Sequence, residues 1–403
     1  MLSFLPPTGS TVSPRAQYPV SNVTFLETCP PHARARALTD FGAIAQDVAL
    51  ALCRSRQGGS RSSIDVWDQF CDSLNLDPTL ANCPDPIPAI QLFAHRYRTG
   101  EIAPNGAQVR GKTVGGADRA VGQAFAGMGL PDPRLSAGGH LDLRLSRQLS
   151  SYTKHDCPPT RVKPIPLPVL RHAVRCARAL DTPYHHALAD MIILGFYFLL
   201  RPGEYADTAN PESSPFRLCD VHLFCHGARI SPQQLAAGTL PTFVALEFTT
   251  QKNGVKGELI GLGASGDPSF CPVHTVRNRV LALVQHRAAL TTPLYTYYAN
   301  NLTFSITSAH LTSALRVAVQ IVGIPLGLTP PDISTRSLRC SGAMALLCAN
   351  VDTDRIRLLG RWRSDEMLRY LHVQAVPVVA PIAAAMLRNG HFNLLPNQPL
   401  PAP

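Results

Sequence analysis

The chain has 403 residues, with 37 lysines and arginines against 27 aspartates and glutamates, and a formal net charge of +10. This length allows two domains with hydrophobic cores, and the positive charge favours a polyanionic partner. No apolar run approaches a membrane span, and the first residues lack the pattern of a signal peptide. Eleven cysteines without a CxxC pair indicate buried thiols in a reducing compartment rather than a disulfide framework. We therefore expect an intracellular protein without a membrane partner.

The N-terminal part of the chain changes character near residue 38. Residues 1–37 are rich in proline, serine and threonine and show little periodicity, so we expect a flexible arm. From 38 to 150 the apolar residues recur at helical spacing, and no segment predicts a strand. The expected helices lie at about 41–52, 63–74, 90–97, 109–128 and 141–149.

Residues 151–168 contain five prolines together with Lys154, Arg161 and Lys163. A proline-rich basic segment of this kind predicts a stiff linker, and we place the main domain boundary there.

Two helices are expected next, at about 168–180 and 184–200. Pro202 and Gly203 end the second helix just after Arg201, which places that guanidinium beside a turn. Glu204 lies three residues further on and could hold Arg201 in one orientation through paired hydrogen bonds. An ordinary surface salt bridge at a helix end is the alternative interpretation.

A hairpin is predicted around residue 252. Val244, Leu246 and Phe248 alternate with more polar residues, which is typical of a strand. Asn253 and Gly254 form a strong two-residue hairpin signal and place Lys252 at the tip. Lys256, on the returning strand, is the second candidate for a functional lysine. A lysine at such a tip can equally serve solubility.

Cysteines and histidines at 219, 222, 225, 226, 271 and 274 invite comparison with a zinc site. Their spacing fits no standard zinc knuckle, and strand alternation would place the first four on two faces. The sequence also lacks a phosphate-binding P-loop and an acidic cluster for two metals. We expect no metal and no cofactor.

The C-terminal block 334–372 predicts three short helices, with Ser334 or Thr335, Asp352 and Ser364 as caps. The second helix should end at Gly360. Between the apolar positions stand polar and aromatic residues that the core does not require, namely Arg336, Arg339, Arg361, Trp362 and Tyr370. Arginines gathered around a phenol, without obvious acidic partners nearby, suggest a phosphate site.

This block resembles the C-terminal signature of the tyrosine recombinases, the phage-integrase-like family. Arg339 matches the arginine of the family's His-x-x-Arg motif, and Tyr370 follows Gly360 by ten residues, as the family spacing requires. The wording RSLRCSGAMALL and LLGRWRSDEMLRYL is most similar to recombinases of eukaryotic DIRS and crypton mobile elements. The sequence departs from the pattern at Arg336, where the family has histidine, and at Arg361, where it has histidine or tryptophan.

The resemblance implies an α+β protein, mainly α with a small β-sheet. A helical core-binding domain at 38–150 would contact DNA, a catalytic domain at 169–390 would cleave it, and a proline-rich tail would follow at 391–403. The implied function is that of a site-specific DNA recombinase or integrase that works through a 3′-phosphotyrosine intermediate. A type IB topoisomerase and a catalytically decayed DNA-binding relic are the alternatives.

The resemblance also implies roles for single residues. Tyr370 would attack the phosphodiester, Arg201 and Arg339 would neutralise its oxygens, Glu204 would orient Arg201, and Lys252 would protonate the leaving 5′-oxygen. Arg336 and Arg361 would donate hydrogen bonds and charge, and Trp362 would support the site by packing. Phosphate contacts along double-stranded DNA are expected from Arg96, Arg98, Arg110, Lys112, Arg119, Arg144, Arg147, Lys154, Arg161 and Lys163. We expect a tetrameric synapse on DNA, a monomer or dimer off DNA, and nuclear residence if the host is eukaryotic.

Overall fold

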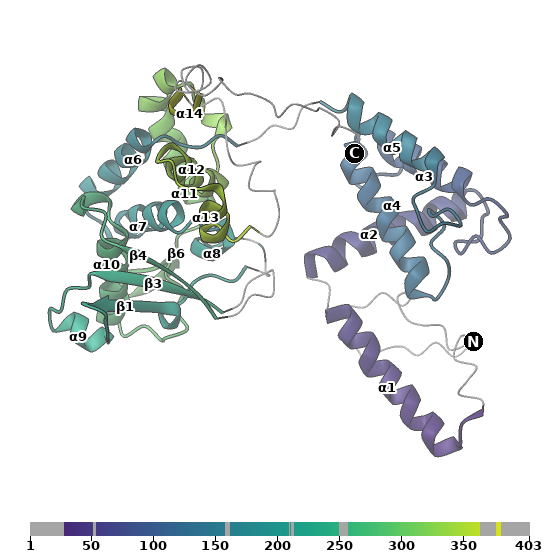
Figure 1. The fold of residues 1–403 in the computed structure, drawn as a ribbon, viewed down its shortest axis with the longest axis horizontal. Coiled ribbons are helices and arrows are strands. Elements are labelled where there is room, and N and C mark those ends of the chain that lie inside the picture. The colour runs from purple at the N-terminus through teal and green to yellow at the C-terminus, as the bar shows by residue number, and fades with distance from the viewer. Residues whose placement is uncertain are drawn as a thin grey trace, which may run out of the picture. The chain divides into compact units, whose positions relative to one another are not determined.

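The computed structural model describes residues 28–50, 54–157, 162–208, 210, 213–249, 257–362 and 376–379. The chain divides into two compact units, Met1–Pro159 and Thr160–Pro403 (Figure 1). We call them unit 1 and unit 2 and describe each by itself.

Every regular element in the described part of unit 1 is a helix. The central contact is an aromatic cluster in which the Trp67 ring meets Phe70, Phe93 and Phe125 at centroid distances of 5.5, 5.2 and 6.5 Å. These rings form a buried core because their helical spacing places them on the inner faces of their helices. The helices are α1 (Pro31–Leu50), α2 (Arg54–Ser73), α3 (Ile87–Thr99), α4 (Gly111–Gly127) and α5 (Leu143–His155).

Two helices of unit 1 extend past the predicted domain boundaries. Helix α1 begins at Pro31, inside the expected arm, because a proline is pre-organised for the first helical position and the following HARARAL segment favours helix. Helix α5 continues to His155, inside the expected linker, because no helix breaker precedes Pro158. Gly111 at the start of α4 packs against Tyr152 and Thr153, where an added Cβ would lie 2.9 Å from each residue.

The far end of the expected linker belongs to unit 2. The Ile165 side chain is buried in that unit's core, and the Ile165 amide donates to Ser341 Oγ at 2.7 Å. The Lys163 amide donates to the Asp332 carbonyl at 3.0 Å. Residues 158–161, with Arg161, lie outside the described part of the chain.

Helix α7 (Pro183–Tyr197) is the central element of unit 2, with every residue from 187 to 196 buried. Such a helix is apolar on all sides because neighbours cover all of its faces. Helices α6 (Leu167–Ala179), α10 (Pro272–Gln285), α11 (Ser308–Ala318) and α12 (Arg336–Cys348) pack against it. The shorter helices are α8 (Pro202–Tyr205), α9 (Pro232–Ala236), α13 (Thr353–Leu359) and α14 (Val376–Val379).

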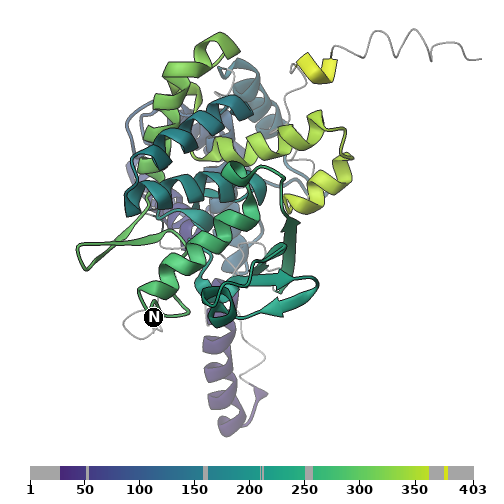
Figure 2. The ribbon, with the colours of Figure 1, turned by 90° about the vertical axis from the view of Figure 1, so that its left-hand side faces the viewer.

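The strands of unit 2 form two antiparallel sheets. The larger sheet has the order β2-β1-β3-β4, and a separate hairpin pairs β5 with β6. Val244, Leu246 and Phe248 are buried on β3, which confirms the predicted strand, although Ala245 between them is buried as well. The strands are β1 (Val221–Cys225), β2 (Ala228–Ile230), β3 (Phe243–Phe248), β4 (Glu258–Gly263), β5 (Thr296–Ala299) and β6 (Leu302–Ser305). In Figure 2 the larger sheet lies below the helices, and the yellow-green helices α12 and α13 lie together beside it.

Strands β3 and β4 are neighbours with Phe248 opposite Glu258, so the segment between them joins two paired strands. Residues 250–256, with Lys252 and Lys256, lie outside the described part. The prediction that Lys252 lies at a hairpin tip therefore stays a prediction.

One helical stretch of unit 2 differs from the expectation about membrane spans. Ser308–Leu326, 19 residues long, is apolar and long enough to cross a membrane by length and composition alone. It consists of α11 followed by a π-helical turn at Val319–Gly323 and a 3-10 turn at Ile324–Leu326. Its N-terminal part packs on α6 and α7, so contacts within unit 2 cover part of its apolar surface.

Candidate active site

The first part of the site is the turn that follows α7. Leu199 has φ +48°, a left-handed conformation that is unusual for a bulky side chain, and Arg201 follows as the residue that precedes α8. Glu204 Oε2 accepts the Arg201 backbone N–H at 2.8 Å, and Glu204 Oε1 accepts from Arg201 Nη1 at 3.1 Å. The contact that the sequence predicts between Arg201 and Glu204 is therefore present.

Glu204 has a second partner, Arg361, which lies 157 residues further along the chain. Arg361 Nη1 and Nη2 donate to Oε1 and Oε2 of Glu204 at 3.3 and 3.0 Å. The Arg361 guanidinium also lies 3.8 Å from the centre of the Phe248 ring, and its side chain is only 4% exposed. Arg361 therefore donates hydrogen bonds and charge to Glu204 inside the protein, and a role toward DNA stays a prediction.

The charge state of this pair follows from its partners. Burial alone would raise the pKa of Glu204, but the guanidiniums of Arg361 and Arg201 hold that pKa below its ordinary value. Burial lowers the pKa of Arg361, whereas Glu204 acts in the opposite direction, and a guanidinium starts from so high a pKa that it stays protonated. Both members of the pair are charged at neutral pH.

Arg339 is also turned to internal partners. It is 3% exposed, its Nη1 donates to the Leu199 carbonyl at 2.5 Å, and its Nη2 donates to the Gly360 carbonyl. The guanidinium lies 4.2 Å from the centre of the Trp362 ring, so these two side chains pack against each other. Gly360 is required here, because an added Cβ would lie 1.5 Å from the Trp362 ring.

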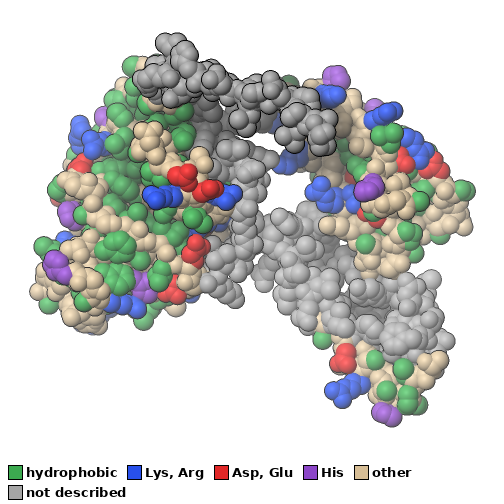
Figure 3. Space-filling view, viewed as in Figure 1, with side chains coloured by type: hydrophobic (Ala, Val, Ile, Leu, Met, Phe, Trp, Pro, Cys, Tyr) green, Lys and Arg blue, Asp and Glu red, His purple; other side chains and the backbone are tan. Residues whose placement is uncertain are grey.

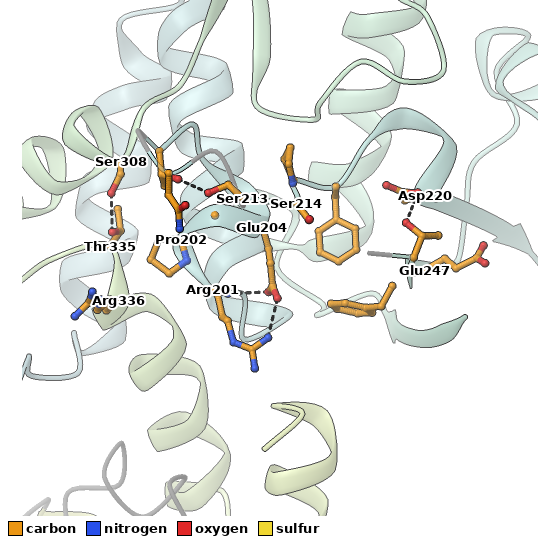
Figure 4. Close-up of a pocket in the computed structure, with 17 residues that line it drawn as sticks. Arg201, Pro202, Glu204, Ser213, Ser214, Asp220, Glu247, Ser308, Thr335 and Arg336 are labelled. Atoms are coloured by element: carbon orange, nitrogen blue, oxygen red, sulfur yellow. Dashed lines mark hydrogen bonds and ion pairs between the residues drawn. The ribbon is translucent and has the colours of Figure 1, made fainter. Parts of the chain in front are cut away.

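A pocket of about 430 Å³ opens beside the Arg201 turn (Figure 4). Arg201 and Arg336 line it, together with the hydroxyl-bearing residues Ser213, Ser308 and Thr335. Arg336 is exposed, and no partner in the described part of the chain pairs with it. The other end is acidic, but Asp220 is paired with Arg217 and Glu247 lies 2.7 Å from His222. The cationic end is the part of the pocket able to receive an anion.

The sequence did not predict the hydroxyl pair at this end. Ser308 Oγ lies 2.9 Å from Thr335 Oγ1 (Figure 4). The buried Tyr205 hydroxyl donates to the Thr335 carbonyl at 2.9 Å. Thr335 precedes α12 but makes no side-chain cap bond to it. Its position next to Arg336 is the only local signal. By contrast, Asp352 caps α13 as predicted, accepting from Asp354 and Arg355 amides.

Two candidate residues with central roles lie outside the described residues, namely Tyr370 and Lys252. Their positions relative to Arg201 and Arg336 stay predictions. The cap expected at Ser364 falls in the same undescribed segment.

The cations of unit 1 that the sequence predicts as DNA contacts fall into two groups. Three are paired with carboxylates: Arg98 with Asp156 at 2.5 Å, Arg144 with Asp85 and Asp142, and Arg96 with Glu101. Arg98 is a structural residue, since it is largely buried and also donates to the Val109 carbonyl. Figure 3 shows cationic and acidic side chains next to each other on this unit. The exposed candidates are Arg110, Lys112, Arg119, Arg147 and Lys154.

The remaining expected DNA contact, Lys163 in unit 2, lies 3.0 Å from Asp332. The cysteines and histidines weighed as a zinc site do not converge in the described residues, where no cluster of three or more metal-type ligands occurs. His222 is instead paired with Glu247 across two neighbouring strands.

No protein-family model and no curated protein sequence matches this chain. Among solved structures it is similar to the XerH site-specific recombinase bound to palindromic difH substrate in a post-cleavage complex. That match has a TM-score of 0.50 and 10% identity, and it covers 94% of this chain and 92% of that chain. The chain is also similar to the Tn1549 transposon integrase in complex with transposon right-end DNA, with a TM-score of 0.48, 11% identity, and 84% and 95% coverage. The XerH match confirms the predicted α+β fold.

Proposed function

We propose that this protein is a site-specific DNA recombinase or integrase that breaks and rejoins DNA strands. One observation carries the proposal. The segments 199–204, 336–339 and 360–362, far apart in the sequence, meet around the Leu199 carbonyl and Glu204, next to a pocket whose cationic end holds Arg201 and Arg336. The XerH-like fold adds support, because that relative is described as a site-specific recombinase bound to its DNA substrate.

The proposed reaction follows from the side chains. Tyr370 attacks a DNA phosphodiester, which forms a phosphotyrosine bond to the 3′ side and releases a 5′-hydroxyl. A phenol has a pKa near about 10, so its oxygen must lose its proton as it attacks. Lys252 gives a proton to the leaving 5′-oxygen. The phosphoryl bond energy is kept in the protein–DNA link, so the reaction needs no nucleotide cofactor.

Arg201 and Arg336 are the cations best placed to receive the phosphate, because they line the pocket. They would neutralise the charge that builds on the non-bridging oxygens in the transition state. Arg336, which stands where the family has histidine, thus supplies a second guanidinium at the cationic end of the pocket. Arg339 is buried, and its terminal nitrogens donate to carbonyls. Its positive charge would stabilise the phosphate oxygens without touching them.

Double-stranded DNA is the proposed partner, with Arg110, Lys112, Arg119, Arg147 and Lys154 as phosphate contacts. The proposal includes a tetrameric synapse on DNA and a monomer or dimer off DNA. An origin in a eukaryotic mobile element, and with it a nuclear location, rests on the sequence resemblance alone.

A decayed DNA-binding relic is the second candidate, favoured by the presence of arginine at positions 336 and 361. The buried Arg361–Glu204 pair speaks against decay, because an arginine that arrived by drift would rarely find a buried carboxylate partner and an aromatic ring.

The test uses a library of duplexes, each with a nick close to the candidate cleavage position, so that the short released strand diffuses away and the covalent intermediate accumulates. Wild type and Tyr370→Phe are incubated with the library and run on denaturing gels. The proposal expects an adduct with wild type only, and sequencing of the trapped DNA then gives the site. DNA binding without an adduct from either protein would establish the relic. Relaxation of supercoiled DNA without strand exchange would indicate a type IB topoisomerase.

A further inference from the structure

Glu204 is saturated by two arginines. Its carboxylate accepts four hydrogen bonds, two on each oxygen, from Arg201 N, Arg201 Nη1, Arg361 Nη1 and Arg361 Nη2. We call Arg201, Glu204, Arg361 and the Leu199 carbonyl the Glu204 network. If Arg361 were removed, Glu204 would lose half of these bonds in a site where its side chain is 11% exposed. A buried carboxylate with unused acceptors draws the nearest cation toward itself.

Arg361 is held on several sides and does not face the pocket. Its Nη2 donates to the Leu199 carbonyl at 3.3 Å, and its guanidinium lies over Phe248, which is packed at right angles against Phe216 at 4.7 Å. Arg361 is absent from the lining of the pocket, whereas Arg201 and Glu204 are both part of it. A phosphate in that pocket would therefore contact Arg201, whereas Arg361 could act on it only through Glu204 and Arg201.

The Leu199 carbonyl links both buried arginines to the turn that carries Arg201. Arg339 and Arg361 both donate to this one oxygen. The left-handed backbone of Leu199 is strained. Such a conformation persists only where the surrounding structure holds it in place. Two guanidiniums on its carbonyl are such surroundings. Arg361 thus holds the Arg201 turn at Leu199 and again at Glu204.

The charges of the network favour an anion at Arg201. Two guanidiniums and one carboxylate sum to +2 − 1 = +1. The Arg361 side chain is 4% exposed and the Arg201 side chain 31% exposed, so the uncompensated charge reaches solvent at Arg201. Without Arg361, Glu204 would neutralise Arg201 alone, and the pocket would lose that charge.

We propose that Arg361 is a positioning residue for DNA cleavage: it does not contact the phosphate, but fixes Glu204 and the Leu199 carbonyl so that Arg201 keeps its orientation and its free charge. This inference rests on the proposed function. It assigns Arg361 a role through Arg201 rather than through a direct contact with the phosphate. Lysine is a poor substitute, because a single ammonium cannot reproduce the bidentate pair and the stacking on Phe248.

The experiment compares single-turnover cleavage of the trapped nicked duplex by wild type, Arg361→Met, Arg201→Ala and the double variant. Arg357→Met is the matched control, since Arg357 lies on α13, four residues before Arg361, is 43% exposed and pairs with the exposed Asp354 in the described part of the chain. We expect Arg361→Met to cleave about 10²-fold more slowly, the usual result of a small misplacement of a reacting group. DNA affinity should equal that of the Arg357→Met control. The double variant should lose little beyond Arg201→Ala, because residues that act as a unit are not additive.

A folding defect is separated from a positioning defect in two ways. Glu204→Gln combined with Arg361→Met removes both buried charges, so the unfolding midpoint should return toward wild type while cleavage stays slow. A methylphosphonate at the scissile position removes one negative charge from the phosphate. On this substrate the fold-loss of cleavage rate caused by Arg361→Met should be smaller, and so should the fold-loss caused by Arg201→Ala. A folding defect would instead reduce the cleavage rate by the same factor on both substrates.

Three results overturn the inference while leaving the proposed function intact. The first is a wild-type cleavage rate in Arg361→Met. The second is a double variant whose loss of rate equals the product of the losses in Arg361→Met and Arg201→Ala. The third is a recovery of both cleavage and stability in the variant that combines Glu204→Gln with Arg361→Met. An absence of adduct with wild type itself refutes the proposed function, and the positioning role falls with it.

Discussion

Asp118 should make the stability of unit 1 fall as the pH rises from about 4 to about 7. This aspartate lies on α4 and is 1% exposed, and neither of its carboxylate oxygens has a hydrogen-bond partner among the residues that the structure describes. Burial raises the pKa of Asp118 to about 7, against a weaker opposing effect of the Arg134 guanidinium. Arg134 is itself paired with Asp132, which limits that effect.

The size and sign follow from proton linkage. In the unfolded chain Asp118 ionises near 3.8, whereas in the folded chain it keeps its proton to about 7. Between these values the folded state binds more protons, so raising the pH favours unfolding. About 3 pKa units at about 1.4 kcal/mol each make the loss about 4 kcal/mol. Below about pH 4 the effect is absent, and above about pH 7 it is complete and constant.

The chain suits this measurement because it has two tryptophans, one in each unit. In a Trp362→Phe background, Trp67 is the only tryptophan and reports denaturant unfolding of the unit 1 core. Asp118→Ala should be more stable than its parent at pH 8 by up to about 4 kcal/mol, and the two should converge near pH 4. Asp72→Ala, at an exposed position of α2, is the control and should show no such change. A difference between Asp118→Ala and its parent that is independent of pH, or that grows toward acid, would refute the reasoning.

Three further predictions concern packing and DNA binding. Gly360→Ala should place a methyl group against the Trp362 ring, lower the free energy of unfolding by about 1–3 kcal/mol, and slow cleavage; calorimetry and the adduct gel measure the two effects. Arg98→Met should remove the ion pair to Asp156 and the hydrogen bond to the Val109 carbonyl, so the unfolding midpoint of unit 1 should fall, while the salt dependence of DNA binding stays unchanged. Lys112→Ala should leave the stability of unit 1 unchanged and reduce the slope of log affinity against log salt by about 0.9. Binding titrations at several salt concentrations measure this slope, and a wild-type slope would contradict the prediction.

The sequence determined the features that depend on neighbours within a few residues. Helical spacing identified the aromatic core of unit 1, alternation identified β3, and Asp352 and Gly360 marked the two ends of α13. The Arg201–Glu204 contact also belongs here, because Pro202 begins a turn that brings a residue and its third successor together. In each case the geometry of the local backbone is enough to define the contact.

Only the tertiary structure decided which charges are paired across long sequence distances. Arg361 and Arg336 look alike in the sequence, yet one is buried on Glu204 and Phe248 while the other lines the open pocket. Arg98 is likewise predicted as a DNA contact from the sequence, whereas in the fold the C-terminal end of α5 places Asp156 beside it. A guanidinium carries the same charge and donors wherever it stands, so its role depends on which acceptors the fold places beside it. That placement results from the packing of distant helices and strands, which no local pattern records.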